Sequence, residues 1–283
     1  PDGRYSVILP WNDEVKRLSN NKTLAFTMLE TLKHRFDESP KIHDEYAATI
    51  NKLRDSDCFE EYPLDYVDKN SDYILIPHHA VLKFERETTK CRPVFWGHAA
   101  APGFASCNDA IEPGPDLGRM IPKILMSIRQ GKFLFTADLK TCFFQLHLAD
   151  ENPVKLLILW LVKQEDGTFK TELLRFKHMP WGLNCSMFCV LAVIHYHVIL
   201  TILREKDPER RKTLRRMLNG QYVDDVNIPL QDEKLMLMTA KIAKEVFESA
   251  QMPLVKLRGN SSVMREHFPK DALNPDDKLV VER

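Results

Sequence analysis

Hydrophobic and polar positions alternate with a helical period over much of the first 60 residues. Asn21 is placed to cap a helix that runs through Arg35, and the period resumes at residues 43–53 after a break at Ser39-Pro40. Side chains three and four positions apart share one face of a helix, so the first helix carries an apolar stripe of Leu24, Met28, Leu29 and Leu32. The pattern therefore predicts a helical N-terminal segment.

Beyond residue 70, short apolar runs bounded by turn residues replace this period. The clearest case is a hairpin of residues 154–162 and 168–176 around Glu165-Asp166-Gly167. We expect further strands at residues 73–76, 80–84, 93–96, 132–139, 221–230 and 254–257, and helices at residues 122–129, 185–203 and 232–250. Strands and helices that do not alternate strictly predict an α+β fold, in which helices cover an antiparallel sheet.

Composition narrows the class of protein. Of the 283 residues, 44% are hydrophobic and 28% are charged, which is typical of a globular protein and excludes long disorder, collagen and a disulfide mini-protein. We expect no membrane partner, because we find no run of about 18 uncharged apolar residues. The sequence begins with Pro1 rather than Met, so we interpret it as a fragment of a longer protein.

The six cysteines include no C-x-x-C pair, which predicts reduced thiols and an intracellular location. A zinc site at Cys185, Cys189, His195 and His197 is disfavoured, since only the two cysteines would share a helix face. His78-His79 has no carboxylate or nucleophile at a readable spacing, so we expect a structural role for it.

Charge is balanced overall but uneven along the chain. The 40 Lys and Arg residues match 40 Asp and Glu residues, while residues 204–216 hold seven basic side chains against three acidic ones. This stretch is either a solvated helix with internal ion pairs or a contact for a phosphate backbone. Net neutrality does not exclude a nucleic-acid partner, but it predicts weak binding that depends on salt.

Two carboxylates stand side by side in the apolar setting of Tyr222-Val223-Asp224-Asp225. Like charges in such a setting are costly unless a cation neutralises them, so the motif indicates either a divalent metal site or a hydrated turn. A third carboxylate, Asp138, ends the apolar strand predicted at residues 132–139. Oxygen ligands without His or Cys suit Mg²⁺ or Mn²⁺ rather than Zn²⁺.

The order of Arg92, Asp138, Met179-Pro180-Trp181-Gly182, Tyr222-Val223-Asp224-Asp225 and Lys256 resembles reverse transcriptases, and more narrowly the polymerase segment of Pao-type (Bel/Pao) LTR retrotransposon polyproteins. The resemblance implies reverse-transcriptase-like fingers and palm. It divides the chain into an N-terminal helical extension (1–70), a fingers-like region (71–132), a palm with a fingers insertion (133–265) and a C-terminal tail (266–283) without a thumb. It implies an RNA-directed DNA polymerase, a nucleotidyltransferase that extends a template-primer with dNTPs. Protease, RNase H and integrase domains would lie outside this chain.

The resemblance also implies roles for single residues. Asp138, Asp224 and Asp225 correspond to the catalytic metal ligands, and Lys256 to a basic residue proposed to protonate pyrophosphate. The residues that correspond to the nucleotide-binding site are Lys83, Arg92, the steric gate Phe143, and Trp181 and Gly182.

Several positions depart from the family pattern, among them Trp96, Lys140, Ser186-Met187 and Leu257. If the strand alternation continues past Asp138, Lys140 faces the same side and would pair with it, which would oppose Mg²⁺ binding. An alternative is therefore a decayed or domesticated polymerase-fold module that binds nucleic acid or protein without turnover.

Overall fold

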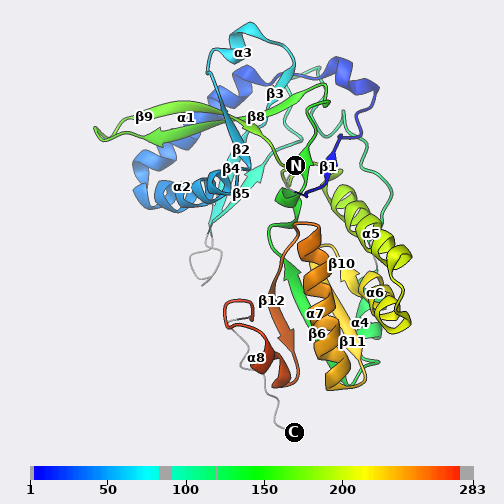
Figure 1. Cartoon of the computed structure of the whole chain (residues 1–283). Helices are drawn as coiled ribbons and strands as arrows, with labels where there is room; N and C mark the ends of the chain where they lie inside the picture. The colour runs from blue at the N-terminus through cyan, green and yellow to red at the C-terminus, as the bar shows by residue number, and fades with distance from the viewer. Residues whose placement is uncertain (1–2, 83–90, 119, 275–283) are drawn as a thin grey trace. The chain divides into compact units, whose positions relative to one another are not determined.

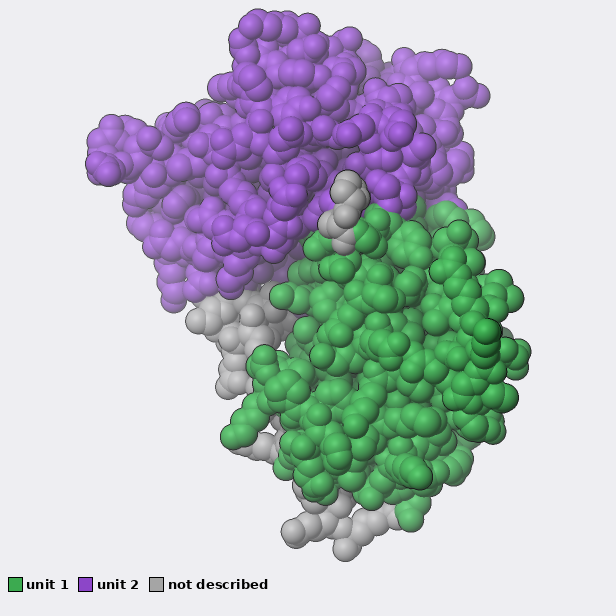
Figure 2. Space-filling model, in the orientation of Figure 1, with its two compact units in different colours: residues 1–5, 115–145, 187–283 green, residues 6–114, 146–186 purple. Residues whose placement is uncertain are grey.

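The computed structural model describes residues 3–82, 91–118 and 120–274 and groups the chain into two compact units (Figure 2). Unit 1 comprises residues 1–5, 115–145 and 187–283, and unit 2 comprises residues 6–114 and 146–186. Each unit is thus assembled from stretches that are distant in sequence. The domain borders expected after residues 70, 132 and 265 stay predictions.

The centre of unit 1 is an antiparallel sheet with the strand order β10-β11-β6-β12 (Figure 1). Its inner strand β6 (Phe133–Leu139) buries every second residue, at Phe135, Ala137 and Leu139. This alternation is the period that a sheet with one covered face requires. The neighbouring strands are β10 (Gln221–Tyr222), β11 (Asp225–Leu230) and β12 (Leu254–Gly259).

Helices pack on this sheet. α7 (Glu233–Ser249) contacts β6, β11 and β12, while α4 (Ile121–Ile128) and α6 (Pro208–Gly220) contact β11. α7 begins as predicted, because the Asp232 carboxylate accepts a hydrogen bond from the Leu235 N–H. Unit 1 also contains the 3₁₀ turn Cys142–Gln145, the helix α8 (Val263–His267) and almost all of α5 (Ser186–Arg204).

Unit 2 is built on a second sheet, with the strand order β2-β9-β8-β3, and on the β4-β5 hairpin. The helices α1 (Lys22–Glu38) and α2 (Pro40–Asp55) pack on β8 and β5, respectively. The strands are β2 (Phe59–Tyr62), β3 (Tyr73–Leu75), β4 (His78–Leu82), β5 (Cys91–Phe95), β8 (Lys155–Lys163) and β9 (Phe169–Phe176). A parallel pair of short strands, β1 (Ser6–Val7) and β7 (His147–Leu148), the 3₁₀ turn Asp13–Arg17 and the short helix α3 (Tyr66–Lys69) complete the unit.

The core of unit 2 is aromatic and encloses a histidine. Phe36, Tyr46 and Trp160 contact one another edge to face, and His78 lies against Tyr46 and Trp160. His78 Nε2 lies 2.7 Å from the Leu159 carbonyl oxygen, and His78 Nδ1 lies 2.6 Å from the Tyr46 hydroxyl. A neutral ring satisfies both contacts, with Nε2–H donating and Nδ1 accepting. The structural role expected for His78 is confirmed.

The predicted α+β class is confirmed, with corrections in detail. β2 lies in a stretch for which no strand was expected. Asn21 stands at the N-cap position of α1, but its side chain donates a hydrogen bond to the Ala99 carbonyl instead of capping the helix. The six cysteines are buried and lie outside any disulfide, as predicted.

The prediction that no long uncharged apolar run exists is wrong for α5. This helix is long and apolar enough to cross a membrane by length and composition, and its most apolar window is 33% buried. A core helix passes the same test, and α5 buries Val190, Leu191, Ile194 and Val198 within the protein.

The basic stretch at residues 204–216 forms the loop after α5 and most of α6. The helix interpretation is confirmed, but the ion pairs are not internal to α6, since Arg210 pairs with Glu205 before the helix and with Glu245 on α7. One face of α6 is buried through Leu214 and Met217. A contact with phosphates stays a prediction.

Candidate active site

Two carboxylates face each other at one end of the unit 1 sheet. In the antiparallel pairing of β6 with β11, Asp138 stands directly opposite Asp225. Residues opposite each other in such a ladder have Cβ atoms about 5 Å apart. Both side chains are half-buried. The register of two strands thus brings together acids that are 87 positions apart in sequence.

The third carboxylate, Asp224, lies in the turn between β10 and β11. Its carbonyl oxygen accepts a hydrogen bond from the Leu139 N–H at 2.7 Å, which fastens the turn to the end of β6. The preceding Val223 has φ +50°, a left-handed conformation that a β-branched residue rarely adopts, and its carbonyl accepts from Gln221 Nε2 at 2.7 Å. The Asp224 side chain is exposed at the tip of this strained hairpin.

Lys256 forms an ion pair with Asp138. Its Nζ lies 2.6 Å from Asp138 Oδ2, and the two side chains are 46% and 34% exposed. Lys256 lies in an irregularity of β12, between Val255 and Arg258, and has φ +52°. We use the name acid cluster for Asp138, Asp224, Asp225 and Lys256.

Three acids and one base lie close together in the acid cluster, and their partial burial changes the pKa values of the groups around them. Burial raises the pKa of Asp225 to about 6, and the charges of Asp224 and Asp138 and a hydrogen bond with Asp138 add to this effect. Burial also raises the pKa of the nearby Cys142 thiol to about 12, with the charges of Asp224 and Asp225 as further causes. Removal of a proton from this cluster is costly without an added cation.

The cluster's donors fit a hard divalent cation in chemistry. Carboxylate oxygens are the ligands that Mg²⁺ and Mn²⁺ take, and like charges that already hold a carboxyl pKa high are relieved by a bound cation. In the arrangement of the described residues, however, no three His, Cys, Asp or Glu side chains are grouped so that they could hold a metal. One of the three acids is engaged by Lys256 instead.

The cation opposite Asp138 is therefore not the one expected from the strand alternation. β6 ends at Leu139, and Lys140 is exposed in the following turn, where its N–H donates to the Pro253 carbonyl. Within the described residues, Lys140 forms no ion pair with Asp138. The expectation fails because the extended backbone does not continue past Leu139, so a period of two no longer applies.

Phe143 follows the strand of Asp138 by five residues and lies in the 3₁₀ turn Cys142–Gln145 of unit 1. Its ring is half-buried, whereas the next residue, Phe144, is 2% exposed. Phe144 is thus a core residue, whereas Phe143 keeps part of its ring accessible. The role of Phe143 as a steric gate stays a prediction.

The other expected nucleotide-binding residues belong to unit 2, and Lys83 lies outside the described residues. Arg92 is exposed on β5, opposite Val81. Trp181 lies beside Phe95, and its indole N–H donates to the Pro93 carbonyl at 2.6 Å. Gly182 has φ +97°, and a Cβ there would collide with the Phe95 carbonyl oxygen. Glycine is required at this position for both reasons.

Asn108 holds the Gly182 loop, and no role was expected for it. Its Nδ2 donates to the Gly182 carbonyl at 3.0 Å, and its Oδ1 accepts from the Asn184 N–H at 3.0 Å. Asn184 Nδ2 in turn donates to the Asn108 carbonyl at 2.7 Å. A Cβ on Gly97 would lie 2.6 Å from the Gly182 carbonyl oxygen, so Gly97 makes room for this approach. We name Gly97, Asn108, Gly182 and Asn184 the asparagine clamp.

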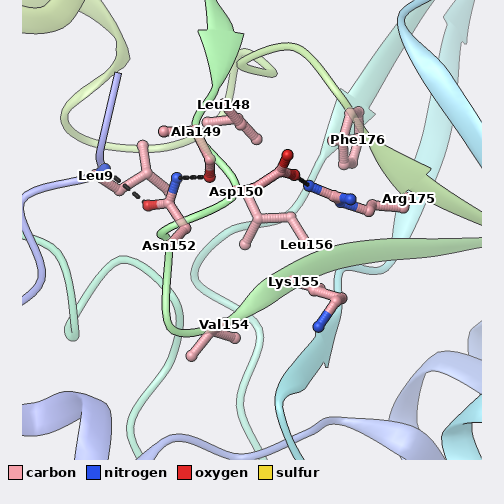
Figure 3. A pocket seen from close by; sticks show the side chains of 10 residues that line it. All are labelled: Leu9, Leu148, Ala149, Asp150, Asn152, Val154, Lys155, Leu156, Arg175 and Phe176. Carbon is pink, nitrogen blue, oxygen red and sulfur yellow. Dashed lines mark hydrogen bonds and ion pairs between the residues drawn. The ribbon is translucent and has the colours of Figure 1, made fainter. Parts of the chain in front are cut away.

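One pocket of unit 2, lined by none of the asparagine clamp residues, has a volume of about 140 Å³ (Figure 3). Its polar side chains already have partners. Arg175 pairs with Asp150 and Glu60, and Lys155 pairs with Asp72. Asn152 Oδ1 accepts from the Leu9 N–H at 2.8 Å. The pocket therefore presents satisfied ion pairs rather than donors turned to a ligand.

Comparison with known protein families finds no match, and no curated protein matches the sequence. The fold is similar to that of solved protease-reverse transcriptases of foamy virus. A selenomethionine-labelled CSH mutant of the prototype foamy virus protein has 16% identity and a TM-score of 0.51, over 78% of this chain and 24% of that chain. The native protein has 17% identity and a TM-score of 0.50, over 78% and 24%.

A third structure is a foamy viral protease-reverse transcriptase in complex with double-stranded DNA, with 13% identity, a TM-score of 0.51 and coverage of 75% of this chain and 30% of that one. This chain spans only about a quarter to a third of the length of these solved chains. At such identities the likeness concerns the fold. The chain has a mixed α+β fold of the reverse transcriptase type.

Proposed function

We propose that this chain is the polymerase segment of an RNA-directed DNA polymerase. It extends a primer 3′-hydroxyl on an RNA or DNA template by nucleotidyl transfer from dNTPs. The observation that carries the proposal is the register of β6 and β11, which sets Asp138 opposite Asp225 beside the Asp224 turn, in a fold similar to that of foamy virus reverse transcriptases.

Asp138 and Asp224, with Asp225 in support, are the residues that would hold Mg²⁺ or Mn²⁺. The metal ions would lower the pKa of the primer hydroxyl and would neutralise charge on the departing pyrophosphate. Val223 and Gln221 shape the hairpin that presents Asp224. In this proposal, Phe143 excludes a ribose 2′-hydroxyl.

The proposal also assigns nucleotide-binding roles to residues of unit 2 and to Lys83. Arg92, together with Lys83, binds the triphosphate, and Trp181 with Gly182 forms a backbone surface for the nascent base pair. The exposure of Arg92 and the close approach of backbone at Gly182 support these roles. Arg92 is a planar, permanent cation, which suits phosphate recognition.

The origin of the chain belongs to the proposal as well. The motif order supports a Pao-type (Bel/Pao) retrotransposon polyprotein, with protease, RNase H and integrase domains elsewhere in the polyprotein. An intracellular location is part of the proposal, because the cysteine spacing includes no C-x-x-C pair and suits reduced thiols.

Primer extension with Mg²⁺ on an RNA template tests the proposal. We expect incorporation of dNTPs by the wild-type protein and a loss of at least about a hundredfold in Asp224→Asn, since a neutral amide is a poor ligand for Mg²⁺. Asp232→Asn is the matched control, because Asp232 caps α7 in the same unit and Asn caps a helix equally well. Extension that survives Asp224→Asn would refute the assignment.

One observation favours a second candidate, a module that binds nucleic acid without turnover. Asp138 is paired with Lys256, and no metal-binding group of three is formed among the described residues. Binding of primer–template by fluorescence anisotropy, unchanged in Asp138→Asn and Asp224→Asn and without extension, would establish this candidate. We expect the binding to be weak and to fall as salt rises, given the neutral net charge.

A further inference from the structure

The contact of Lys256 with Asp138 occupies an atom that the proposed function assigns to a metal. The ammonium group lies 2.6 Å from Asp138 Oδ2, within hydrogen-bonding distance. We propose that Lys256 is a resident counter-cation, which neutralises Asp138 in the metal-free protein and must leave before Asp138 can bind a divalent ion. This inference rests on the proposed function and adds a competition at its metal site.

The backbone of β12 is shaped to allow this contact. Val255 stands opposite Asp138 in the β12–β6 ladder, so in a regular strand Val255 would share the face of Asp138 and Lys256 would point to the other face. The register shifts between Val255 and Arg258, and Lys256 takes φ +52°. A bulge of this kind re-aims a side chain. The irregularity thus turns Lys256 toward the acid instead of away from it.

Neighbouring contacts hold the bulge in place. Leu257 is fully buried, and its N–H donates to the Ala272 carbonyl at 2.9 Å. The Leu257 carbonyl accepts from the Asn274 N–H at 3.1 Å. The Leu257 backbone beside Lys256 is therefore held by both of its polar groups, and these bonds do not involve the lysine side chain.

The balance of charge in the acid cluster allows a divalent cation to displace Lys256 from Asp138. Asp138, Asp224 and Asp225 supply three carboxyl groups, and Lys256 is the cation placed at hydrogen-bonding distance from one of them. The side chains of Lys256 and Asp138 are 46% and 34% exposed, so solvent screens their attraction. A divalent ion attracts the same carboxylate with twice the charge.

Direct metal binding tests the competition without a need for catalysis. Free Mn²⁺ measured by electron paramagnetic resonance gives its affinity for the wild type, for Lys256→Met and for Lys241→Met. Lys241 is exposed on α7 in the same unit and controls for the loss of one positive charge. We expect Lys256→Met to bind Mn²⁺ about tenfold more tightly than the wild type and Lys241→Met to stay within about twofold.

Two further variants keep the test decisive. Lys256→Arg retains the charge and should keep the wild-type affinity for Mn²⁺. Asp138→Asn combined with Lys256→Met should not show the tighter Mn²⁺ binding expected of Lys256→Met alone. Circular dichroism verifies that each variant is folded, and Lys256→Gln replaces Lys256→Met if the latter is not. Equal Mn²⁺ affinity in the wild type and the folded Lys256 variant overturns the counter-cation. The same result leaves the proposed polymerase intact wherever Mn²⁺ supports primer extension. A complete lack of Mn²⁺ binding in every variant overturns both.

Discussion

The acid cluster of unit 1 and the asparagine clamp of unit 2 are both polar arrangements, but they are satisfied in different ways. In the clamp, Asn108 is 5% exposed and forms neutral hydrogen bonds to two backbone groups of the Gly182 loop. In the acid cluster, Lys256 pairs with only one of the three carboxyl groups, Asp138, and the backbone is left-handed at Val223 and Lys256. The neutral hydrogen bonds of Asn108 hold a backbone loop in place, whereas the acid cluster concentrates negative charge on a strained backbone, where a cationic ligand would relieve it.

This contrast predicts the largest loss of stability from the clamp. Asn108→Ala removes partners from the Gly182 carbonyl and the Asn184 N–H, and we expect it to lower the free energy of unfolding of unit 2 by about 3 kcal/mol. Asp138→Asn should change the stability of unit 1 by less than about 1 kcal/mol, because its ion pair is partly exposed. All four tryptophans lie in unit 2, so urea titration followed by their fluorescence reports the first variant, and circular dichroism reports the second. Equal losses of unfolding free energy in Asn108→Ala and Asp138→Asn would contradict this difference between the asparagine clamp and the acid cluster.

Acid should weaken unit 2 through His78. Burial lowers the pKa of this histidine to about 4, so the unfolded chain, with an ordinary histidine pKa of 6.5, takes up the proton first as the pH falls. The stability that the neutral ring confers is complete above about pH 6.5 and is lost between that value and about pH 4. The loss amounts to about 3 kcal/mol, since each pKa unit corresponds to about 1.4 kcal/mol. His78→Gln should flatten this part of the pH profile, measured by Trp fluorescence in urea, while Gln in place of the exposed His34 should not.

The contribution of Asp225 to stability should change with pH in the opposite direction to that of His78. Its pKa is raised to about 6, so its protonated form stabilises the fold fully below an ordinary Asp pKa of about 4, and this contribution disappears as the pH rises through 6. Asp225→Asn removes the unfavourable charge, and we expect unit 1 to gain about 1 kcal/mol at pH 8 after allowance for solvent screening, but little at pH 4. Urea unfolding at the two pH values, followed by circular dichroism, measures this difference. An equal gain at both values would exclude charge as the cause.

The sequence was sufficient for the parts of the site that depend on local pattern. The apolar run before Asp138 predicts β6, and the flanking Val and Ile residues predict β11 after the acidic turn, so two acids at strand ends were visible as candidates. Their meeting in one ladder depended on the resemblance. Element types were predictable for the same reason, because helix and strand periods are local properties.

The parts that could not be predicted depend on irregular backbone or distant partners. Lys140 was expected to oppose Asp138 because a period of two was extended past the end of β6, whereas the bulge that turns Lys256 toward Asp138 has no pattern in the sequence. Asn108 pairs with residues 74 and 76 positions away, so only the close approach of two glycines, Gly97 and Gly182, could have hinted at its role. Such contacts are properties of the packed chain.

The smallest effect concerns the strained turn of the acid cluster. Val223 has φ +50°, where a β-branched residue is unfavourable and glycine is not. Val223→Gly should therefore raise the free energy of unfolding of unit 1 by about 0.5 to 1 kcal/mol, although it removes a half-buried apolar side chain. Val255→Gly is the matched control, since Val255 is also half-buried but lies in β12 outside the left-handed region, and this change should lower stability by about 1 kcal/mol. Circular dichroism in urea measures both variants. Losses of similar size would show that the turn stores no strain, and the acid cluster would then resemble the asparagine clamp as a relaxed structural element.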